Sequence, residues 1–249
     1  MKAVSSSAPP GREIFAPFAM VARALGHPCR LGLLQLLAQG ERSVEALAEQ
    51  AGLGLANASQ HLQQLRRAGL VATRRQGNRI FYRLSDRAVV ALLSALRRLA
   101  ERNLSEVARL VERHFKVLDQ AEPIGPVELV QRMKKGLVTL IDVRPAEEFA
   151  QGHLPGALNL PLAELGRRAR LLPRRRAVVA YCRGPYCMLS YEAVASLRRR
   201  GFTALRLEDG VPEWRARGLP VERGAPQALA PQRRKGGAAA RRLRAANRR

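Results

Sequence analysis

The sequence predicts two domains of different class: a mainly α-helical domain with a β-hairpin, followed by a three-layer α/β domain. The first half contains several short helical patterns and then two β-type segments rich in arginine. The second half alternates near-continuous apolar runs, at 137–143 and 177–181, with helical stretches, which is typical of buried parallel strands and their covering helices. A break with proline and glycine at 119–126 separates the halves, and 249 residues suffice for two cores.

Composition divides the chain into five parts. They are a flexible N-terminus at 1–13, the helical domain at 14–118, a linker at 119–125, the α/β domain at 126–224 and a basic tail at 225–249. Within the tail, residues 226–249 hold eight basic side chains, no acidic ones and no aromatic ones. Such a segment buries too little apolar area to offset the entropy of ordering, so we expect the tail to be disordered.

The chain is strongly basic, with 44 lysines and arginines against 20 acidic residues and a net charge of +24. A field of this sign favours polyanions such as DNA or RNA, and an arginine-rich surface without such a partner is the alternative. The chain lacks both a run of about 18 apolar residues and the apolar core of a signal peptide, so we expect no membrane contact. Three cysteines, an odd number, argue against a disulfide framework and for the cytoplasm.

Helical and strand signals of the first domain are short and close together. Apolar spacing predicts helices over 15–25, after Pro28, after an N-cap at Ser43, and over 55–68, the last ending at Gly69. Strands over 70–75 and 79–84 flank a turn at 76–78, and a long helix follows over about 86–118.

Two short helices joined by a glycine-containing turn and followed by a basic hairpin describe a winged helix-turn-helix. Helix 55–68 then fits the major groove of DNA, where base edges present a readable pattern of donors and acceptors. Arg74, Arg75 and Arg79 of the hairpin then lie beside the phosphates. The alternative is a small helical domain whose hairpin arginines are only solvated.

Three motifs of this domain follow one another in a fixed order. They are Leu25-Gly26-His27-Pro28-Cys29-Arg30-Leu31, the stretch from Ser59 to Val71, and Arg75-Gln76-Gly77-Asn78-Arg79-Ile80-Phe81-Tyr82. Together they resemble the ArsR/SmtB family of winged-helix repressors, which implies binding to a double-stranded DNA operator. The resemblance also implies that Asn57, Ser59 and Gln60 face base edges. It further implies that His61 helps to seat the recognition helix and that Arg79 belongs to the wing.

The last helix of this domain carries a seam suited to pairing with a second copy. Along the helix the seam positions alternate spacings of four and three, as in coiled coils, with one asparagine that can fix the register. The seam consists of Val89, Leu93, Leu96, Ala100, Asn103, Val107, Leu110, His114 and Val117. Members of the resembled family are dimers, so we expect a homodimer; packing of this face on its own domain is the alternative.

The sequence offers no metal site of the resembled family. Such sites need cysteines on the third helix or Asp and His pairs on the last one, and neither set is present. The four histidines, at positions 27, 61, 114 and 153, lack the spacing of ligands. We therefore expect no metal and no cofactor, and Cys29 is expected to be a small buried residue at a helix start.

A cysteine loop joins the apolar strand 177–181 to a following helix, with Cys182 as its first residue. Backbone N–H groups converge at such a place and the helix presents its positive end. We therefore expect a lowered pKa and a nucleophilic thiolate at Cys182, with added positive charge from Arg183. The amides of Gly184, Tyr186 and Met188 are expected to complete the cradle. A buried core cysteine is the alternative.

Such a cradle suits two classes of anionic substrate. Phosphate esters need an arginine six residues after the cysteine to clamp the phosphoryl oxygens, and Met188 occupies that position. Transfer of sulfane sulfur needs only a thiolate and N–H donors that hold a persulfide anion. The sequence therefore favours sulfur chemistry.

Four motifs of the second domain occur together in one family of domains. They are Ile141–Phe149, His153–Asn159, Cys182–Cys187, and Asp209–Trp214 with Gly218-Leu219-Pro220. Together they resemble the rhodanese domain over about 124–222, which implies a persulfide on Cys182 and scaffold salt bridges from Asp142, Arg144 and Glu147.

The cysteine loop departs from the common rhodanese pattern at two positions. Pro185 replaces a glycine and removes one N–H donor, and Cys187 replaces an arginine that usually helps to bind thiosulfate. Cys187 is either a resolving thiol that attacks the persulfide or a residue that merely packs at the helix start.

The two resemblances together predict a transcriptional regulator, and a repressor in its resting state, with a sulfurtransferase-like module. The first hypothesis is a sensor, in which a sulfane-sulfur donor or persulfide modifies Cys182 and Cys187 and so changes operator affinity. The second is a sulfurtransferase enzyme that passes persulfide sulfur to a thiol or another acceptor and has an accessory DNA-binding domain. A third treats the rhodanese part as a protein-interaction domain.

Overall fold

The structure is a computed structural model that describes residues 11–116 and 123–225. Most of the predicted N-terminal segment and linker, the tail 226–249 and the seam residue Val117 therefore lie outside the described residues. Two compact units are present, one formed by Met1–Lys116 with Asp209–Val221 and the other by Val117–Glu208 with Glu222–Arg249. Segment 209–221, which the sequence assigned to the second domain, groups with the first unit. Within the described residues, every helix is too short or too polar to cross a bilayer.

The first unit contains the helices and the hairpin that the sequence predicts. Its elements are α1 (Phe15–Leu25), α2 (Pro28–Ala38), β1 (Arg42–Ser43), α3 (Val44–Ala51), α4 (Leu55–Arg67), β2 (Val71–Gln76), β3 (Arg79–Leu84), α5 (Ala88–Asn103), α6 (Ser105–Val111), the π-helix Glu112–Lys116 and α11 (Val211–Ala216). Ser43 caps α3, since its Oγ accepts a hydrogen bond from the amide of Ala46 at 3.4 Å. Fully buried leucines of α2, α3 and α4, among them Leu34, Leu47 and Leu62, form the core.

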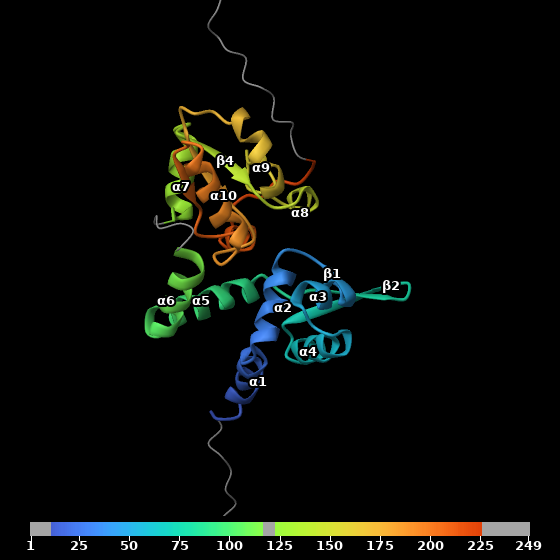
Figure 1. Ribbon diagram of the computed structural model, residues 1–249. Coiled ribbons are helices and arrows are strands. Elements are labelled where there is room, and N and C mark those ends of the chain that lie inside the picture. Colours follow the sequence, from blue (N-terminus) through green and yellow to red (C-terminus); the bar gives the residue numbers. More distant parts are fainter. Residues whose placement is uncertain (1–10, 117–122, 226–249) are drawn as a thin grey trace, which may run out of the picture. The chain divides into compact units, whose positions relative to one another are not determined.

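The hairpin forms the wing. Strands β2 and β3 pair antiparallel around Gly77, whose φ of 58° lies in the left-handed region that a tight turn needs, and β1 joins β3 on its other edge. Figure 1 shows the hairpin projecting from the helices of its unit. The prediction of a winged helix-turn-helix is confirmed.

The prediction of one long helix over 86–118 is wrong. Helix α5 ends at Asn103, because Leu104 adopts an extended conformation (φ −114°, ψ 104°), and the shorter α6 begins after it. The first seam residues, Val89 and Leu93, are buried in the core of their own unit. The large apolar side chains that α5 leaves exposed are Leu92, Leu96 and Leu99, a stripe with spacings of four and three.

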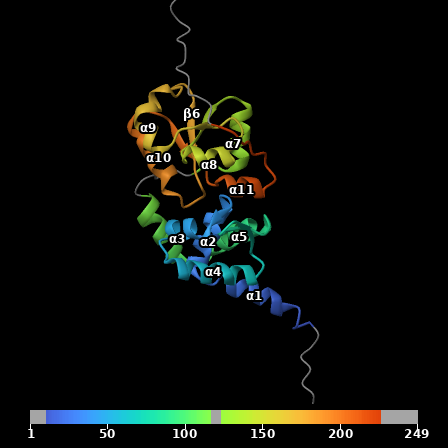
Figure 2. The ribbon, with the colours of Figure 1, turned by 90° about the vertical axis from the view of Figure 1, so that its right-hand side faces the viewer.

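The second unit is an α/β domain with a parallel sheet, as the sequence predicts. Its elements are α7 (Pro126–Lys134), β4 (Val138–Asp142), α8 (Ala146–Gln151), β5 (Leu158–Asn159), α9 (Leu162–Arg168), the 3₁₀-helix Ala169–Leu171, β6 (Ala177–Tyr181), α10 (Met188–Arg199) and β7 (Ala204–Arg206). The strand order is β5-β4-β6-β7 and every pair is parallel. Figure 2 shows β6 between α9 and α10 on one side and α7 on the other. Cover on both faces explains why β4 and β6 are apolar along most of their length.

The register of the sheet aligns polar groups at its carboxyl edge. Asp142, at the end of β4, pairs with Tyr181 of β6 on one side and with Asn159 of β5 on the other. The loops that follow β4 and β6 therefore leave the sheet side by side. One of them carries Arg144 and the other begins with Cys182.

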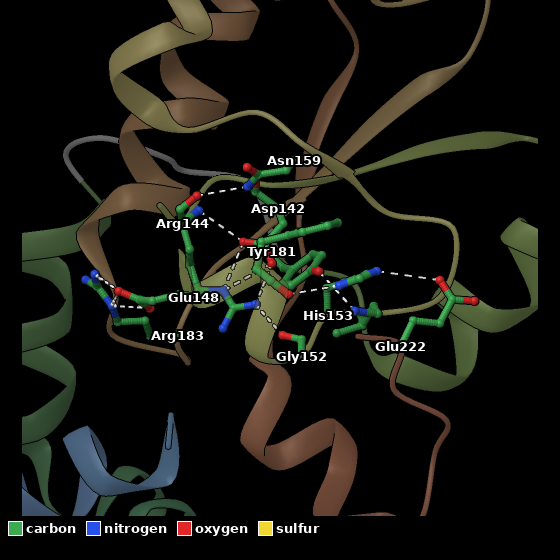
Figure 3. A network of polar contacts seen from close by, with 11 residues as sticks. Asp142, Arg144, Glu148, Gly152, His153, Asn159, Tyr181, Arg183 and Glu222 are labelled. Atoms are coloured by element: carbon green, nitrogen blue, oxygen red, sulfur yellow. Dashed lines mark hydrogen bonds and ion pairs between the residues drawn. The ribbon is translucent and has the colours of Figure 1, made fainter. Parts of the chain in front are cut away.

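A buried ion pair holds the first of these loops (Figure 3). The guanidinium of Arg144 donates to both carboxylate oxygens of Asp142, at 2.6–3.1 Å, and to the carbonyl of Gly152 at 2.7 Å. Asn159 donates to the carbonyls of Asp142 and Arg144. The expected scaffold role of Asp142 and Arg144 thus takes the form of a salt bridge, whereas Glu147 is exposed.

We expect Asp142→Asn to lower the free energy of unfolding of the second unit by about 3–5 kcal/mol, because it leaves the Arg144 charge buried without a counterion. Urea unfolding followed by circular dichroism measures the change. The matched control is Glu164→Gln, which removes a half-exposed ion pair with Arg168 and should change stability by less than about 1 kcal/mol. Equal effects of the two variants would contradict a stabilising role for the buried pair.

Candidate functional site

The cysteine loop, residues 182–187, lies between the carboxyl end of β6 and the first turn of α10. The amide of Cys187 donates to the carbonyl of Gly184 at 3.2 Å, which closes the loop on itself. Pro185 is buried, whereas the side chains of Tyr186 and Met188 are exposed at the loop's rim.

Cys182 lies in the core, as in the alternative that the sequence left open, and is not the low-pKa thiolate that the sequence favours. Its side chain is only 2% exposed and belongs to the apolar core of the second unit. Its Sγ lies 3.3 Å from Oγ of Ser190 and 3.4 Å from the carbonyl oxygen of Cys187. Burial, followed by the hydrogen bond to the Cys187 thiol, raises the pKa of Cys182 well above its ordinary value. The predicted lowered pKa at Cys182 is therefore wrong.

The thiolate of the loop is Cys187, which is half-buried at the N-cap of α10. A hydrogen bond from the Cys182 thiol lowers the pKa of Cys187 to about 6, against the effect of burial. The amides of Arg183 and Leu189 and the positive charge of Arg183 act in the same direction. These two amides differ from the three that the sequence predicts, and of those three only Gly184 acts through its backbone on a loop thiol, that of Cys182.

Arg183 is held in place by Glu148 of α8 (Figure 3). Its Nε lies 3.0 and 3.2 Å from the two carboxylate oxygens, and its terminal nitrogen completes a two-pronged contact at 2.5 Å. Glu148 fixes the guanidinium close enough to the loop for its charge to act on both thiols. Sequence reasoning missed Glu148, because it lies 35 residues away and becomes a neighbour only when β4 pairs with β6.

The residues of helix α4 that the sequence predicts to contact DNA bases differ in their exposure to solvent. Asn57 and Gln60 are exposed, Ser59 is half-buried and His61 is buried. The stripe that points away from the core is completed by two residues the sequence analysis missed, Gln63 and Arg67, at helical spacing from Gln60.

His61 seats α4 against the start of α2. Its ring lies 4.5 Å from the ring of His27, and burial, followed by the electrostatic effects of His27 and Arg30, lowers the pKa of His61. Arg30 reinforces the contact by donating to Oε1 of Gln64 at 2.6 Å. Two histidines that the sequence analysis treated as scattered are thus neighbours, and half-buried Cys29 lies beside them.

The three predicted arginines of the wing lie on different faces. Alternation along the paired strands puts Arg74, Arg79 and Arg83 on one face and Arg75 on the other. Arg74 is engaged by Glu41, with nitrogen–oxygen distances of 2.5 and 3.1 Å, and Arg75 donates to the carbonyl of Gly77 at 3.1 Å. Arg79 and Arg83 are exposed on the wing surface.

This geometry defines a class: a winged-helix regulator that carries a rhodanese-like module with a paired-thiol loop. Known families match both parts, the rhodanese-like domain at residues 125–217 and a helix-turn-helix domain at 25–74. The HTH-type transcriptional regulator Rv0324 of Mycobacterium tuberculosis is 46% identical over 209 residues, which cover 84% of this chain and 91% of that protein. The chain belongs to the ArsR family of helix-turn-helix transcriptional regulators, in the group that carries a rhodanese domain.

Other relatives match one part of the chain. A sulfurtransferase of Allochromatium vinosum is 40% identical over 85 residues, which cover 34% of this chain and 78% of that protein. A solution structure of a homodimeric winged helix-turn-helix DNA-binding domain from Mycobacterium bovis is 38% identical. The match covers 40% of this chain and 93% of the Mycobacterium bovis domain, with a TM-score of 0.37.

We expect Cys182→Ala to raise the pKa of Cys187, because the variant lacks the S–H donor that stabilises the thiolate. Alkylation of wild-type Cys187 by iodoacetamide should reach half its maximal rate near pH 6. In the variant this midpoint should move up by about one pH unit or more, toward that of an ordinary thiol. Mass spectrometry of the modified peptides separates the three cysteines. Cys29→Ser serves as the control, and a midpoint common to wild type and Cys182→Ala would contradict the assignment.

Proposed function

We propose that this regulator is a dimeric DNA-binding repressor whose rhodanese module senses sulfane sulfur through the Cys182–Cys187 pair. The observation that carries the proposal is the pairing of a low-pKa thiol with a buried, hydrogen-bonded one in a single loop. Such a pair suits a single oxidation event with a defined end state, which is what a sensor needs.

The chemistry begins at the ionised thiol. The Cys187 thiolate attacks the outer sulfur of an alkyl persulfide, which forms a Cys187 persulfide and releases the alkyl thiol. The Cys182 thiol then gives its proton to solvent and attacks Sγ of Cys187, which forms the Cys182–Cys187 disulfide and releases hydrogen sulfide. Both protein thiols are oxidised, and the sulfane sulfur is reduced to sulfide. This order reverses the roles expected from the rhodanese resemblance.

The DNA-binding role rests on α4 and the wing. The exposed stripe of α4 offers Gln60, Gln63 and Arg67 to base edges and phosphates of the major groove, with Asn57 at its border. Arg79 and Arg83 of the wing supply phosphate contacts that do not depend on sequence.

Pairing with a second copy gives the exposed leucines of α5 a partner. Leu92, Leu96 and Leu99 form one stripe, and α1 exposes Phe15 and Phe18 at about 60% each. Apolar side chains of this size, grouped on two helices, are typical of an interface between copies of one chain.

The alternative is a sulfurtransferase that turns over, with DNA binding as an accessory. The similarity of 85 residues of this chain to the Allochromatium vinosum sulfurtransferase favours it. With a persulfide or thiosulfate donor, steady-state formation of thiocyanate from added cyanide, or of sulfide with an added thiol as acceptor and reductant, at many turnovers per chain, would support the enzyme. A single turnover that ends in the disulfide supports the sensor.

We expect treatment with cysteine persulfide to lower the operator affinity of the wild-type protein about 5- to 150-fold, the range of a 1–3 kcal/mol coupling. The probe is a duplex selected from a random library by the reduced protein, and gel shift measures its affinity. Cys187→Ser should keep the affinity of the reduced protein and lose the response, because the attacking thiolate is absent. The matched control is Glu164→Gln, a half-exposed position of the same unit outside the cysteine loop, which should respond as the wild type does. Equal affinity of wild type before and after treatment would contradict the sensor.

We expect Leu99→Glu to convert the dimer to a monomer at micromolar concentration, because it places a charge in the apolar stripe of α5. Analytical ultracentrifugation measures the mass. Arg98→Glu, at the neighbouring exposed position, is the control and should leave the dimer intact. A wild-type chain that sediments as a monomer, or a dimer unaffected by Leu99→Glu, would refute this interface.

A further inference from the structure

Three metal-ligating side chains meet where α2 begins. His27 and Cys29 come from the first residues around the start of α2, and His61 comes from the middle of α4. One ligand atom of each lies within 4.8 Å of the other two. The cluster belongs wholly to the first unit and is separate from the cysteine loop.

A second observation points to a ligand at this place. The Nδ1 atom of buried His61 lies away from solvent and has no hydrogen-bond partner among the described residues. Buried nitrogen atoms of this kind are rare, because a polar atom removed from water without a hydrogen bond loses the free energy of its hydration. The neighbouring ring of His27, whose centroid is 4.5 Å away at an angle of 43°, contacts His61 without satisfying that atom.

We propose that His27, Cys29 and His61 form a binding site for a thiophilic transition-metal ion of the Zn²⁺ class. Two imidazoles and one sulfur suit such an ion, whereas Mg²⁺ and Ca²⁺ prefer oxygen ligands. In a tetrahedral zinc site the ligand atoms lie about 3.3–3.7 Å apart, so the cluster closes by about 1 Å when the ion binds. Cys29 binds as the thiolate and releases its proton to solvent. His27 and Cys29 are half-buried, which leaves the fourth position to water.

Binding acts on the start of α2. The Nδ1 atom of His27 accepts the amide of Cys29 at 3.2 Å and thereby caps the helix. Ligation through Nδ1 uses the same lone pair, and ligation through Nε2 puts the ring proton on Nδ1, so either mode ends this hydrogen bond. The ion replaces the cap with a covalent link from α2 to the helix that carries the DNA-facing stripe.

The neighbouring charge sets the selectivity. Arg30 is held nearby by the carbonyls of Arg23 and Ala24 and by Gln64, and its positive charge opposes a cation. The site therefore disfavours ions such as Mg²⁺ and Ca²⁺, which are held mainly by charge, and favours ions that form a strong bond to sulfur.

The test uses the full chain with Cys182→Ala and Cys187→Ala, which leaves Cys29 as its single thiol. This protein is stripped of metal under reducing conditions and titrated with Co²⁺, whose near-ultraviolet charge-transfer band reports a thiolate ligand. We expect one equivalent to bind with this band and excess Zn²⁺ to displace it. Cys29→Ser should abolish the band. His27→Asn, which keeps a capping side chain and lacks the imidazole, should weaken Co²⁺ binding about tenfold or more.

The matched control is His114→Gln, an exposed histidine of the same unit, which should bind Co²⁺ as the parent does. Circular dichroism establishes that each variant is folded. A parent protein without stoichiometric binding, or a Cys29→Ser variant that keeps the band, would overturn the proposal.

Discussion

The parallel pairing of β4 with β6 is the constraint on which the second unit depends. Its register sets Asp142 beside Tyr181, so the loops after both strands emerge at one edge of the sheet. The Asp142–Arg144 pair is buried there with its hydrogen bonds satisfied, which makes the burial of two charges tolerable. Helix α8 starts two residues after Arg144 and carries Glu148, the carboxylate that fixes Arg183. One sheet register thus places both the scaffold ion pair and the clamp of the cysteine loop.

The environment of each sulfur atom decides which of the two thiols keeps its proton and which one ionises. Cys182 is enclosed by apolar side chains and keeps its proton, and it uses that proton to stabilise its neighbour. Cys187 receives this hydrogen bond together with those of backbone amides, and it holds the negative charge. Two residues of the same type, five positions apart, therefore act as donor and nucleophile because of their surroundings rather than their order in the chain.

Local patterns predicted much of the fold, and tertiary contacts decided what they missed. The hairpin followed from β-type segments around a glycine turn, and the parallel strands followed from apolar runs of strand length. The break at Leu104 was missed because seam spacing continues across it and neither glycine nor proline marks it. The cysteine pair was found, but the roles depend on packing that no local signal carries. The approach of His27 to His61, 34 residues apart, arises only when α4 packs on α2.

The charge of the cysteine loop changes when its thiols are oxidised. In the reduced loop the Cys187 thiolate and the Glu148 carboxylate outweigh the single guanidinium of Arg183, for a formal charge of −1. Disulfide formation removes the thiolate and leaves an electrically neutral trio. Oxidation therefore changes the formal charge of the cysteine loop by one elementary charge. The electric field of that charge falls off over about 8 Å at physiological ionic strength. A charged or polar group that responds to this change in charge therefore has to lie within a few side-chain lengths of the loop.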